Sequence, residues 1–351
     1  MATKTQPSPN ISVLAEHVSE HLSVFVVAED TNSERPANGG LRLLNYPTDA
    51  ACIADGERLA GLMTYKHDLY GTGFAGGKIV ARAKEPGAVK DELISITAEL
   101  LQSLEGSMIT GCDLNTSLED MERLTALTPH VLAAVGSPVD ASAATAHGTL
   151  GAVEAALNAE LKDAKPGRVL VHGCGAVGGT VARTLARHGW TVFTVDLSRE
   201  RAAVPGATPL PQGCPWWQLK LDLLVPCSIS GLITAEMTRA IRTSAVVPAA
   251  NAPFQHPQLA EELRQRGIQV LPDPLVNAGA VIADSIERFS PEAWKDAGPE
   301  EVYAFVRGEV RQRAMNFLEQ RKQGISVSEA LVHVAAERSN DPIGLSFGEL
   351  L

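Results

Sequence analysis

The sequence lacks the features that mark several large classes of protein. Its five cysteines are scattered without a Cys-x-x-Cys pair, which argues against a disulfide framework or a zinc site and indicates reduced thiols and no bound metal. No apolar run reaches the roughly 18 residues that a membrane-spanning helix needs. Basic residues number 30 against 41 acidic ones, and the net charge of -11 argues against a nucleic-acid partner.

The amino-terminal segment, Met1 to Asn10, is polar and lacks the apolar core of a secretory signal. We interpret it as a frayed tail and expect a cytoplasmic protein that contacts neither membrane nor nucleic acid. With 45% hydrophobic and 20% charged residues, the chain has the composition of a folded globular protein.

The length of 351 residues predicts two domains. The pattern of apolar residues breaks around Gly136-Ser137-Pro138, and we place the boundary there. Residues 1–135 are expected to form a substrate-binding and oligomerisation domain with a mixed sheet. Residues 136–288 are expected to form the second domain. The helical segments from about residue 289 to residue 351 are expected to pack back on the first domain.

The second domain alternates strand-like and helix-like segments. The apolar strand Arg168–His172 is followed by a glycine-rich turn, a helical run and a second strand that ends at Asp196. Three further short apolar strands lie at residues 221–225, 245–247 and 268–271. This alternation predicts an α/β fold with a doubly wound parallel sheet of the Rossmann type.

The glycine-rich turn after the first of these strands predicts a dinucleotide site. Gly173 permits a tight turn, Gly175 lets the backbone approach a pyrophosphate, and Gly178 allows close packing of helix on strand. The helix begins near Ala176 and Val177, where free N–H groups and the positive end of the helix dipole attract phosphate. The alternative is that these glycines only permit the turn from strand to helix.

The choice of dinucleotide depends on Asp196, which lies 18 residues after Gly178. A carboxylate at this position accepts hydrogen bonds from the ribose hydroxyls and repels a 2′-phosphate, so NAD is expected as the cofactor. Because Arg199 lies close to Asp196 in the sequence, NADP remains the alternative cofactor.

Two lysines twelve residues apart mark a second site, in the first half of the chain. Lys66 follows Met63-Thr64-Tyr65, and Lys78 stands between Gly76-Gly77 and the apolar Ile79-Val80-Ala81. A lysine between exposed backbone and a buried strand is expected to lie in a cleft. Burial beside another cation lowers the pKa of a lysine towards neutrality, which suits proton transfer or the activation of water. The alternative is a pair of solvated surface lysines.

Several other motifs accompany the lysines in order along the chain: Gly39-Gly40-x-Arg42, Asp113-x-Asn115-Thr116, Thr145 and Asn277-Ala278-Gly279. The combined set resembles the glutamate/leucine/phenylalanine/valine dehydrogenase superfamily, closest to its leucine and phenylalanine branch, over about residues 22–338. The resemblance implies two α/β domains with a cleft between them and a homodimer or larger oligomer. It also implies reversible, NAD-dependent oxidative deamination of an L-amino acid to the 2-oxo acid and ammonia.

The resemblance implies a role for each residue that matches a family motif. Lys66 matches the lysine that binds the substrate carboxylate. Lys78 matches the catalytic lysine that polarises the developing carbonyl and activates water, and Asp113 matches the general acid/base. The other matching positions are Gly39, Gly40, Met63 and Asn277 at the substrate, and Thr145, Ala250 and Asn251 beside the nicotinamide.

Two departures from the family pattern concern the substrate. Asn38 precedes the glycine pair, where the resemblance implies lysine in glutamate-specific members and an apolar residue in the leucine and phenylalanine members. Asp284 falls near a second specificity position, usually apolar or serine. If both point inward, the pocket is polar and acidic; if a local shift displaces Asp284, it faces solvent. Glutamate is expected to be a poor substrate. The resemblance implies a substrate with an aliphatic or aromatic side chain, and a substrate with a polar or cationic side chain is the more specific hypothesis.

Two other functions remain open at this point. One is reduction of a cyclic or biosynthetic imine with the same hydride geometry. The other is a catalytically retired sensor or scaffold that binds NAD or an amino acid. The joint presence of Lys66, Lys78 and Asp113 argues against the sensor, because a sensor needs no proton carrier.

Overall fold

The computed structural model describes residues 10–337 and 341–350, so nine of the ten residues expected to form a frayed tail lie outside the described residues. The described residues form two compact units, each with its own sheet. The first unit takes them from Met1–Ser137, Asp284–Lys295 and Arg338–Leu351, and the second from Pro138–Ala283 and Asp296–Glu337. The predicted two-domain α/β class is confirmed. None of the described helices combines the length and the apolar composition of a membrane-spanning segment.

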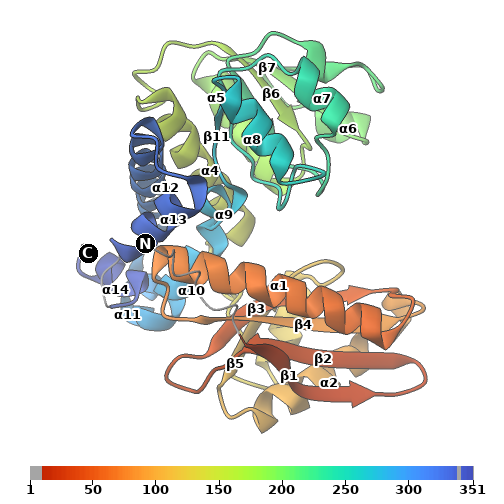
Figure 1. The fold of residues 1–351 in the computed structure, drawn as a ribbon. Helices are drawn as coiled ribbons and strands as arrows, with labels where there is room; N and C mark the ends of the chain where they lie inside the picture. The colour runs from red at the N-terminus through yellow and green to blue at the C-terminus, as the bar shows by residue number, and fades with distance from the viewer. Residues whose placement is uncertain (1–9, 338–340, 351) are drawn as a thin grey trace, which may run out of the picture. The chain divides into compact units, whose positions relative to one another are not determined.

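The first unit is built around a five-stranded sheet (Figure 1). Its elements are β1 (Ile11–Val18), β2 (Leu22–Glu29), β3 (Ala37–Leu44), α1 (Asp49–Tyr70), β4 (Ala75–Ala83), η1 (Pro86–Val89), α2 (Lys90–Ser103), β5 (Met108–Cys112), α3 (Leu118–Thr125), α11 (Pro291–Asp296) and α14 (Ile343–Gly348). The helix α10 (Gly279–Phe289) begins in the second unit and ends in the first.

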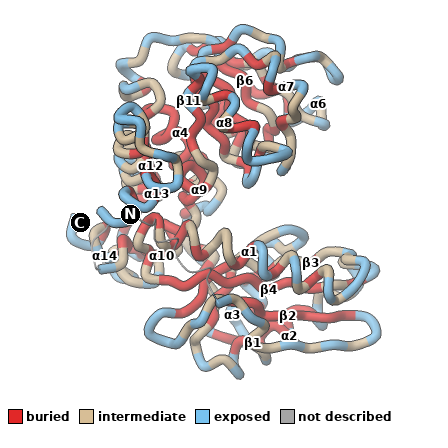
Figure 2. Tube along the Cα trace, viewed as in Figure 1, coloured by how far each residue is buried: buried red, intermediate tan, exposed pale blue. Residues whose placement is uncertain are grey.

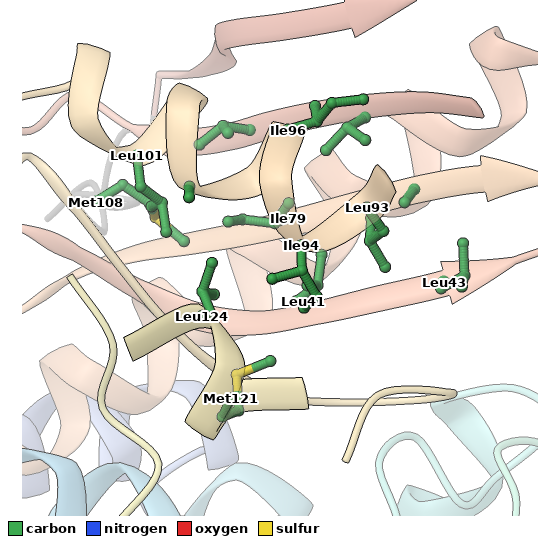
Figure 3. Close-up of a cluster of buried hydrophobic side chains, with 14 of the residues drawn as sticks. Leu41, Leu43, Ile79, Leu93, Ile94, Ile96, Leu101, Met108, Met121 and Leu124 are labelled. Atoms are coloured by element: carbon green, nitrogen blue, oxygen red, sulfur yellow. The ribbon is translucent and has the colours of Figure 1, made fainter. Parts of the chain in front are cut away.

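This sheet has the order β1-β2-β4-β3-β5 and is mixed, as predicted. The first three strands of that order are antiparallel neighbours, whereas β3 is parallel to both β4 and β5. Side chains alternate between the two faces of a strand. One face carries Leu41, Ile79 and Met108, which pack with α2 and α3 in the cluster of Figure 3. The strands β2 and β4 are buried along almost their whole length (Figure 2).

The helix α1 covers the other face of the sheet. It begins after Thr48, whose side chain accepts a hydrogen bond from the N–H of Ala51, and it ends at Gly71 in the left-handed conformation. The helix packs over Phe25 and Val80. It therefore lies on the face of the sheet to which Lys78, two residues before Val80, also belongs.

Later parts of the chain complete the first unit. The hydroxyl of Ser285 on α10 donates to the carbonyl of Thr72, and the N–H of Ile343, the first residue of α14, donates to the carbonyl of Gly71. The rings of Phe74 and Phe289 lie 5.3 Å apart. The end of α1 is thus fixed by residues more than two hundred positions further along the chain.

The second unit is built around a six-stranded parallel sheet with the order β11-β10-β9-β6-β7-β8. Its elements are α4 (Ala141–Leu157), β6 (Arg168–His172), α5 (Ala176–Arg187), β7 (Thr191–Val195), α6 (Arg199–Ala202), β8 (Ala207–Pro209), η2 (Trp216–Gln218), β9 (Leu223–Pro226), α7 (Ala235–Ala240), β10 (Ala245–Val246), α8 (Gln258–Gln265), β11 (Gln269–Val270), α9 (Asp273–Val276), α12 (Pro299–Lys322) and α13 (Val327–Ala336). The strand order reverses between β6 and β9, which is where open α/β sheets bind ligands.

The carboxy-terminal helices differ from the expectation that all of them pack on the first domain. The helices α12 and α13 belong to the second unit, where α12 packs against α4. A Cβ atom at Gly151 of α4 would lie 2.2 Å from the carbonyl oxygen of Arg307, so the absence of a side chain lets the helices approach. The guanidinium of Arg307 also binds both oxygens of Glu154 at 2.7 and 3.0 Å. Only the later part of α10, α11 and α14 return to the first unit.

Candidate functional site

The first unit brings Lys78 and Asp113 together. Lys78 lies in β4 and Asp113 directly follows β5, with β3 between the two strands. The ammonium of Lys78 is 2.5 Å from Oδ2 of Asp113, and the two side chains are 8% and 20% exposed. The pair therefore combines a charge-assisted contact with partial burial, and the carboxylate keeps some contact with solvent.

Burial and neighbouring charges shift the pKa of both groups. Burial lowers the pKa of Lys78, and the nearby Arg42 lowers it further, although Asp113 opposes both effects. Burial alone would raise the pKa of Asp113, but Lys78 and Arg42 outweigh it and hold that pKa below its usual value. The pKa of Lys78 is thus lowered towards neutral pH, and the carboxylate beside it stays ionised.

The glycine pair lies inside β3. Gly39 is buried and Gly40 half-buried, and Gly40 pairs with Gly111 of β5, two residues before Asp113. On the other side, Gly76 of β4 lies against α1, because a Cβ atom there would be 2.2 Å from the backbone nitrogen of Thr64. The glycines beside Lys78 on β3 and β4 thus pack closely against neighbouring backbone.

Lys66 and Met63 come from the part of α1 that Gly76 contacts. Lys66 is 9% exposed and Met63 is half-buried. They flank Thr64, whose hydroxyl donates to Glu29 and to the carbonyl of Ala60. The close contact between α1 and β4 thus places Lys66 in the same unit and on the same side of the sheet as Lys78.

Two polar residues of the first unit, Asn38 and Asp284, lie beside each other. Asn38, the residue before the glycine pair, is 1% exposed and hydrogen-bonds to Asp284 of α10. Its carbonyl oxygen Oδ1 has no hydrogen-bond partner among the described residues. Burial and then Glu287 raise the pKa of Asp284 well above its usual value. Asp284 therefore does not face open solvent but lies beside Asn38.

Glu287 was not identified from the sequence. Its carboxylate accepts a hydrogen bond of 3.1 Å from the N–H of Ala134, and burial raises its pKa to about 7. It lies one helical turn from Asp284 on α10. The only sequence signal was this spacing of three residues, which places two carboxylates on one face of a helix.

In the second unit, the glycine-rich turn leads from β6 into α5 at the point where the strand order reverses. Gly173 has φ +90°, and a Cβ atom at Gly178 would lie 1.9 Å from the carbonyl oxygen of Gly173. At Gly175, which precedes α5, a Cβ atom would meet nothing within 4 Å, and no side chain caps the helix. The first N–H groups of α5, at Ala176 and Val177, are therefore left for a ligand such as a phosphate.

Asp196 follows β7, the strand beside β6. One of its oxygens accepts from the N–H of Cys174 at 2.8 Å, which ties the carboxylate to the glycine turn. The other accepts from the N–H of Ser198 and binds the guanidinium of Arg201 at 2.9 Å. Burial would raise the pKa of Asp196, but Arg201 and the two N–H groups outweigh it and lower that pKa. Asp196 is therefore ionised and paired with a cation.

A second group of expected residues meets at the carboxyl ends of the same sheet. The amide of Asn277 donates to Asn251 at 2.9 Å and to the carbonyl of Ala249 at 3.0 Å. A Cβ atom at Gly279 would lie 2.6 Å from Thr145, which is half-buried on α4, and Ala250 is 7% exposed. Asn277, Asn251, Thr145 and Ala250 thus lie close together in the second unit.

The structure therefore divides the expected site residues into two groups. The first unit holds Asn38, Gly39, Gly40, Met63, Lys66, Lys78, Asp113 and Asp284; the second holds Thr145, Gly173, Gly175, Ala176, Val177, Gly178, Asp196, Ala250, Asn251 and Asn277. Each group is assembled from several elements that lie far apart in the sequence. Arg42 was part of a motif, but its contact with Asp113 was not expected.

Two family models match the chain and together span most of it. The model described as "Glu/Leu/Phe/Val dehydrogenase, dimerisation domain" matches residues 19–130, and the model described as "Glutamate/Leucine/Phenylalanine/Valine dehydrogenase" matches residues 196–339. Both models carry the name of the family that the motifs indicated.

Curated proteins and solved structures agree with this match. The chain is 27% identical over 290 residues to leucine dehydrogenase of Bacillus subtilis, covering 80% of this chain and 79% of that protein. It is 29% identical over 304 residues to phenylalanine dehydrogenase of Caldalkalibacillus thermarum, covering 80% and 82%. The crystal structure of L-tryptophan dehydrogenase from Nostoc punctiforme has the same fold, with a TM-score of 0.72, 23% identity, and coverage of 97% of this chain and 96% of that one. The chain belongs to the glutamate/leucine/phenylalanine/valine dehydrogenase family.

Proposed function

We propose that this protein catalyses the reversible, NAD-dependent oxidative deamination of an L-amino acid other than glutamate, giving the 2-oxo acid and ammonia. The observation that carries the proposal is the contact of 2.5 Å between Lys78 and Asp113. A partly buried ammonium beside an ionised carboxylate provides a donor for a developing oxyanion and an acceptor for protons, which are the two groups that this chemistry needs.

In the proposed mechanism, the three charged side chains of the first unit act on different parts of the substrate. The ammonium of Lys66 binds the α-carboxylate. The carboxylate of Asp113 takes a proton from the α-ammonium, and the ammonium of Lys78 donates a hydrogen bond to the oxygen of the attacking water and to the carbonyl that forms. A bound nicotinamide supplies the hydride acceptor. Asp113 releases that proton to solvent, takes a proton from the water as its oxygen bonds to the imine carbon, and passes this second proton to the nitrogen. Ammonia departs as the C–N bond breaks, and the remaining hydroxyl proton passes to Asp113.

The second unit fits a dinucleotide. The uncapped start of α5 offers N–H groups to a pyrophosphate, and the space beside Gly175 leaves room for it. Leu197, next to Asp196, is 90% exposed, and Ile229, beyond β9, is 66% exposed. These side chains follow the strands on either side of β6 and offer apolar surface to an adenine ring. Asn251, Asn277, Thr145 and Ala250 would lie beside the nicotinamide.

NAD is proposed over NADP because Asp196 is ionised and would repel a 2′-phosphate. Arg201 offsets part of that repulsion. Thermal unfolding with each dinucleotide measures the preference without turnover, because a ligand at a hundred times its Kd stabilises the folded state by about 2.7 kcal/mol. NAD is expected to stabilise the wild type more than NADP does, and replacing Asp196 by alanine is expected to reduce that difference. A larger effect of NADP on the wild type would contradict the assignment.

The side-chain pocket is proposed to accept a group that donates a hydrogen bond. The buried oxygen Oδ1 of Asn38 lacks a partner among the described residues, and a buried acceptor without a partner costs about 1–3 kcal/mol. The carboxyl of Asp284 lies beside it. A second acidic group on the substrate would face this carboxyl, so glutamate is disfavoured. A side chain such as an indole or an ammonium would satisfy Asn38.

Matched substrates test the pocket. With NAD at alkaline pH, kcat/KM is expected to be at least tenfold higher for tryptophan than for phenylalanine, or for lysine than for norleucine, because only the first of each pair carries a donor. Replacing Asp284 by valine should reverse the ratio that the wild type shows. Robust oxidation of glutamate, or a preference for the apolar member of both pairs, would refute the proposed pocket.

The activity itself is tested with Lys78→Ala. This variant is expected to lose at least a thousandfold in kcat while it still binds the amino acid and the dinucleotide in calorimetry, because Lys66 and the second unit remain intact. Undiminished turnover would refute the role of Lys78. Oxidation of NADH by the wild type with a 2-oxo acid should require ammonia; an ammonia-independent rate would favour imine reduction, and binding without any turnover would favour a sensor.

We further propose that the protein is a homodimer or a larger homo-oligomer. The support is the match of residues 19–130 to a model described as a dimerisation domain. Light scattering coupled to size exclusion should give a mass that is a multiple of 37.1 kDa, and a monomer at micromolar concentration would contradict the proposal.

A further inference from the structure

Arg42 belongs to the motif Gly39-Gly40-x-Arg42, but the proposed mechanism gives it no role. Its guanidinium donates to Oδ2 of Asp113 at 2.8 Å. This is the same oxygen that Lys78 contacts at 2.5 Å. The other oxygen, Oδ1, has no hydrogen-bond partner within the part of the chain that the structure describes. Two cations therefore hold one oxygen of the carboxylate and leave the other available.

Arg42 is itself held by a second carboxylate. Its Nη1 donates to Oδ2 of Asp55 on α1 at 3.0 Å. Asp55 also accepts from the hydroxyl of Tyr46 at 2.7 Å and from the guanidinium of Arg58 at 2.7 Å. The side chain of Arg42 is 14% exposed, and that of Asp55 is 19% exposed. The planar guanidinium thus bridges two carboxylates, one on each side, in a partly buried setting.

We propose that Arg42, oriented by Asp55, is a positioning residue that fixes the Asp113 carboxylate so that Oδ2 faces Lys78 and Oδ1 faces the reacting amine. The inference rests on the proposed function, because it assumes that Asp113 is the proton carrier. Without Arg42, the carboxylate is free to rotate and to bind Lys78 through either oxygen or both. A misplaced proton acceptor lowers the rate even when substrate still binds.

The charged groups that act on Lys78 come from three elements: Asp113 after β5, Arg42 on β3 and Asp55 on α1. Arg42 lowers the pKa of Lys78 and also that of Asp113. Loss of the guanidinium charge should therefore raise both values. Arg42 has an electrostatic effect and an orienting effect, which different substitutions separate.

Three variants separate these effects. Arg42→Met removes both charge and contacts. Arg42→Lys keeps the charge but lacks the planar guanidinium that contacts two carboxylates at once. Arg82→Met is the matched control, because Arg82 also joins the sheet to α1 through an ion pair, with Asp49 at 3.1 Å, but does not contact Asp113.

For Arg42→Met, kcat is expected to fall about 10- to 100-fold with a smaller change in KM, since the substrate carboxylate is bound elsewhere. The acidic limb of kcat/KM for amino-acid oxidation should move to higher pH by about one unit. In Arg42→Lys, the acidic limb of kcat/KM should lie at nearly the same pH as in the wild type, whereas kcat should remain reduced. Arg82→Met should change neither quantity, although it can lower the unfolding temperature.

A readout independent of turnover separates this inference from the proposed function. The rate at which an amine-directed reagent labels Lys78, followed by mass spectrometry across pH, reports its pKa directly. At a pH below the pKa that Lys78 has in either protein, Lys78 of the Arg42→Met variant should be labelled about tenfold more slowly than Lys78 of the wild type. This result is expected even if the protein does not oxidise amino acids.

A double-mutant cycle tests whether Asp55 acts through Arg42. Asp55→Asn should lower kcat by itself, but in the Arg42→Met background it should have little further effect, because the residue that it orients is gone. Additive losses would show that Asp55 acts independently and would overturn the proposal that it acts by orienting Arg42. Unchanged kcat, pH limb and labelling in Arg42→Met would overturn the role of Arg42. A wild type without amino-acid oxidation but with the labelling shift would refute the proposed function and leave only the electrostatic contact.

Discussion

At the scale of single residues, one unusual feature is a carboxyl group whose pKa lies close to neutral pH. Burial raises the pKa of Glu287 to about 7, although the N–H of Ala134 opposes the shift. In the unfolded chain a glutamate has a pKa of about 4.3. Between these values the unfolded chain has lost the proton that the folded protein retains. Stability therefore falls as the pH rises from about 4.5 to about 7.

Replacing Glu287 by glutamine is expected to remove the part of this pH dependence that Glu287 contributes. Glutamine can still accept the hydrogen bond from Ala134 and carries no charge. The variant should be more stable than the wild type by roughly 1–2 kcal/mol at pH 8, which is less than the full shift because the side chain keeps some solvent contact. At pH 4.5 the two should be equal. Urea unfolding at both pH values gives the comparison.

The exposed Glu57 of α1 supplies the control. Glu57→Gln removes the same charge from the same unit without a buried environment, so its effect should be small at both pH values. A constant difference between wild type and Glu287→Gln across the pH range would show that Glu287 titrates normally.

The sequence predicted residues of the site better than it predicted their contacts. Lys78 and Asp113 were identified from motifs, and their contact is consistent with that reading. The bonds from Arg42 to Asp55 and Asp113 were not predicted, because they join residues 13 and 71 positions apart on different elements. Such contacts follow from sheet order and helix packing, and a local motif carries no information about either.

At the scale of elements, short apolar strands and glycine turns were predictable, whereas the edge strand β1 was not. The strands that became β6 and β9 read as compact apolar runs because both of their faces are covered. The strand β1 lies at the edge of its sheet, only half-buried, with a register shift between Val13 and Ala15. That irregularity interrupts the alternation of apolar and polar residues by which a strand is recognised.

The glycine turn before α5 allows the fold and the ligand site to be tested separately. A Cβ atom at Gly178 would meet the carbonyl oxygen of Gly173 at 1.9 Å, whereas a Cβ atom at Gly175 meets no atom within 4 Å. Gly178→Ala should therefore lower the unfolding temperature. Gly175→Ala should leave it within about 1 °C but fill the space proposed for the pyrophosphate, so that NAD stabilises the variant less. Calorimetric unfolding with and without NAD measures both effects. Equal stabilisation of the wild type and Gly175→Ala would place the dinucleotide elsewhere.

At the scale of the whole molecule, each unit is built from more than one stretch of chain. The chain passes from one unit to the other after residues 137, 283, 295 and 337. The sequence predicted boundaries near residues 136 and 288 and a return of the chain to the first domain after the second boundary. It did not predict that the chain enters the second unit again after residue 295, because the later crossings lie in or beside helices and carry no break in pattern. The helix α14, near the carboxyl terminus, thus belongs to the unit that holds Lys78 and Asp113.

This arrangement predicts that damage to α14 affects the lysine site selectively. Phe347 is 2% exposed, and its loss should cost about 3–5 kcal/mol. The N–H of Ile343 binds the carbonyl of Gly71 at the end of α1, so loosening α14 frees the helix that carries Lys66. In Phe347→Ala, hydrogen exchange should accelerate in β3 and β4 but not in β6 and β7. Amino-acid turnover should fall while NAD still binds.

The matched control for this prediction is Leu345→Ala, because Leu345 lies on the same helix and is 39% exposed. It shortens a side chain of similar size without removing a buried one, so exchange in β3 and β4 should stay near the wild-type rate. Acceleration of equal size in β6 and β7 of Phe347→Ala would mean that the two units unfold as one. In that case the division of the chain into two units would not describe its stability, and α14 would support both sites rather than the lysine site alone.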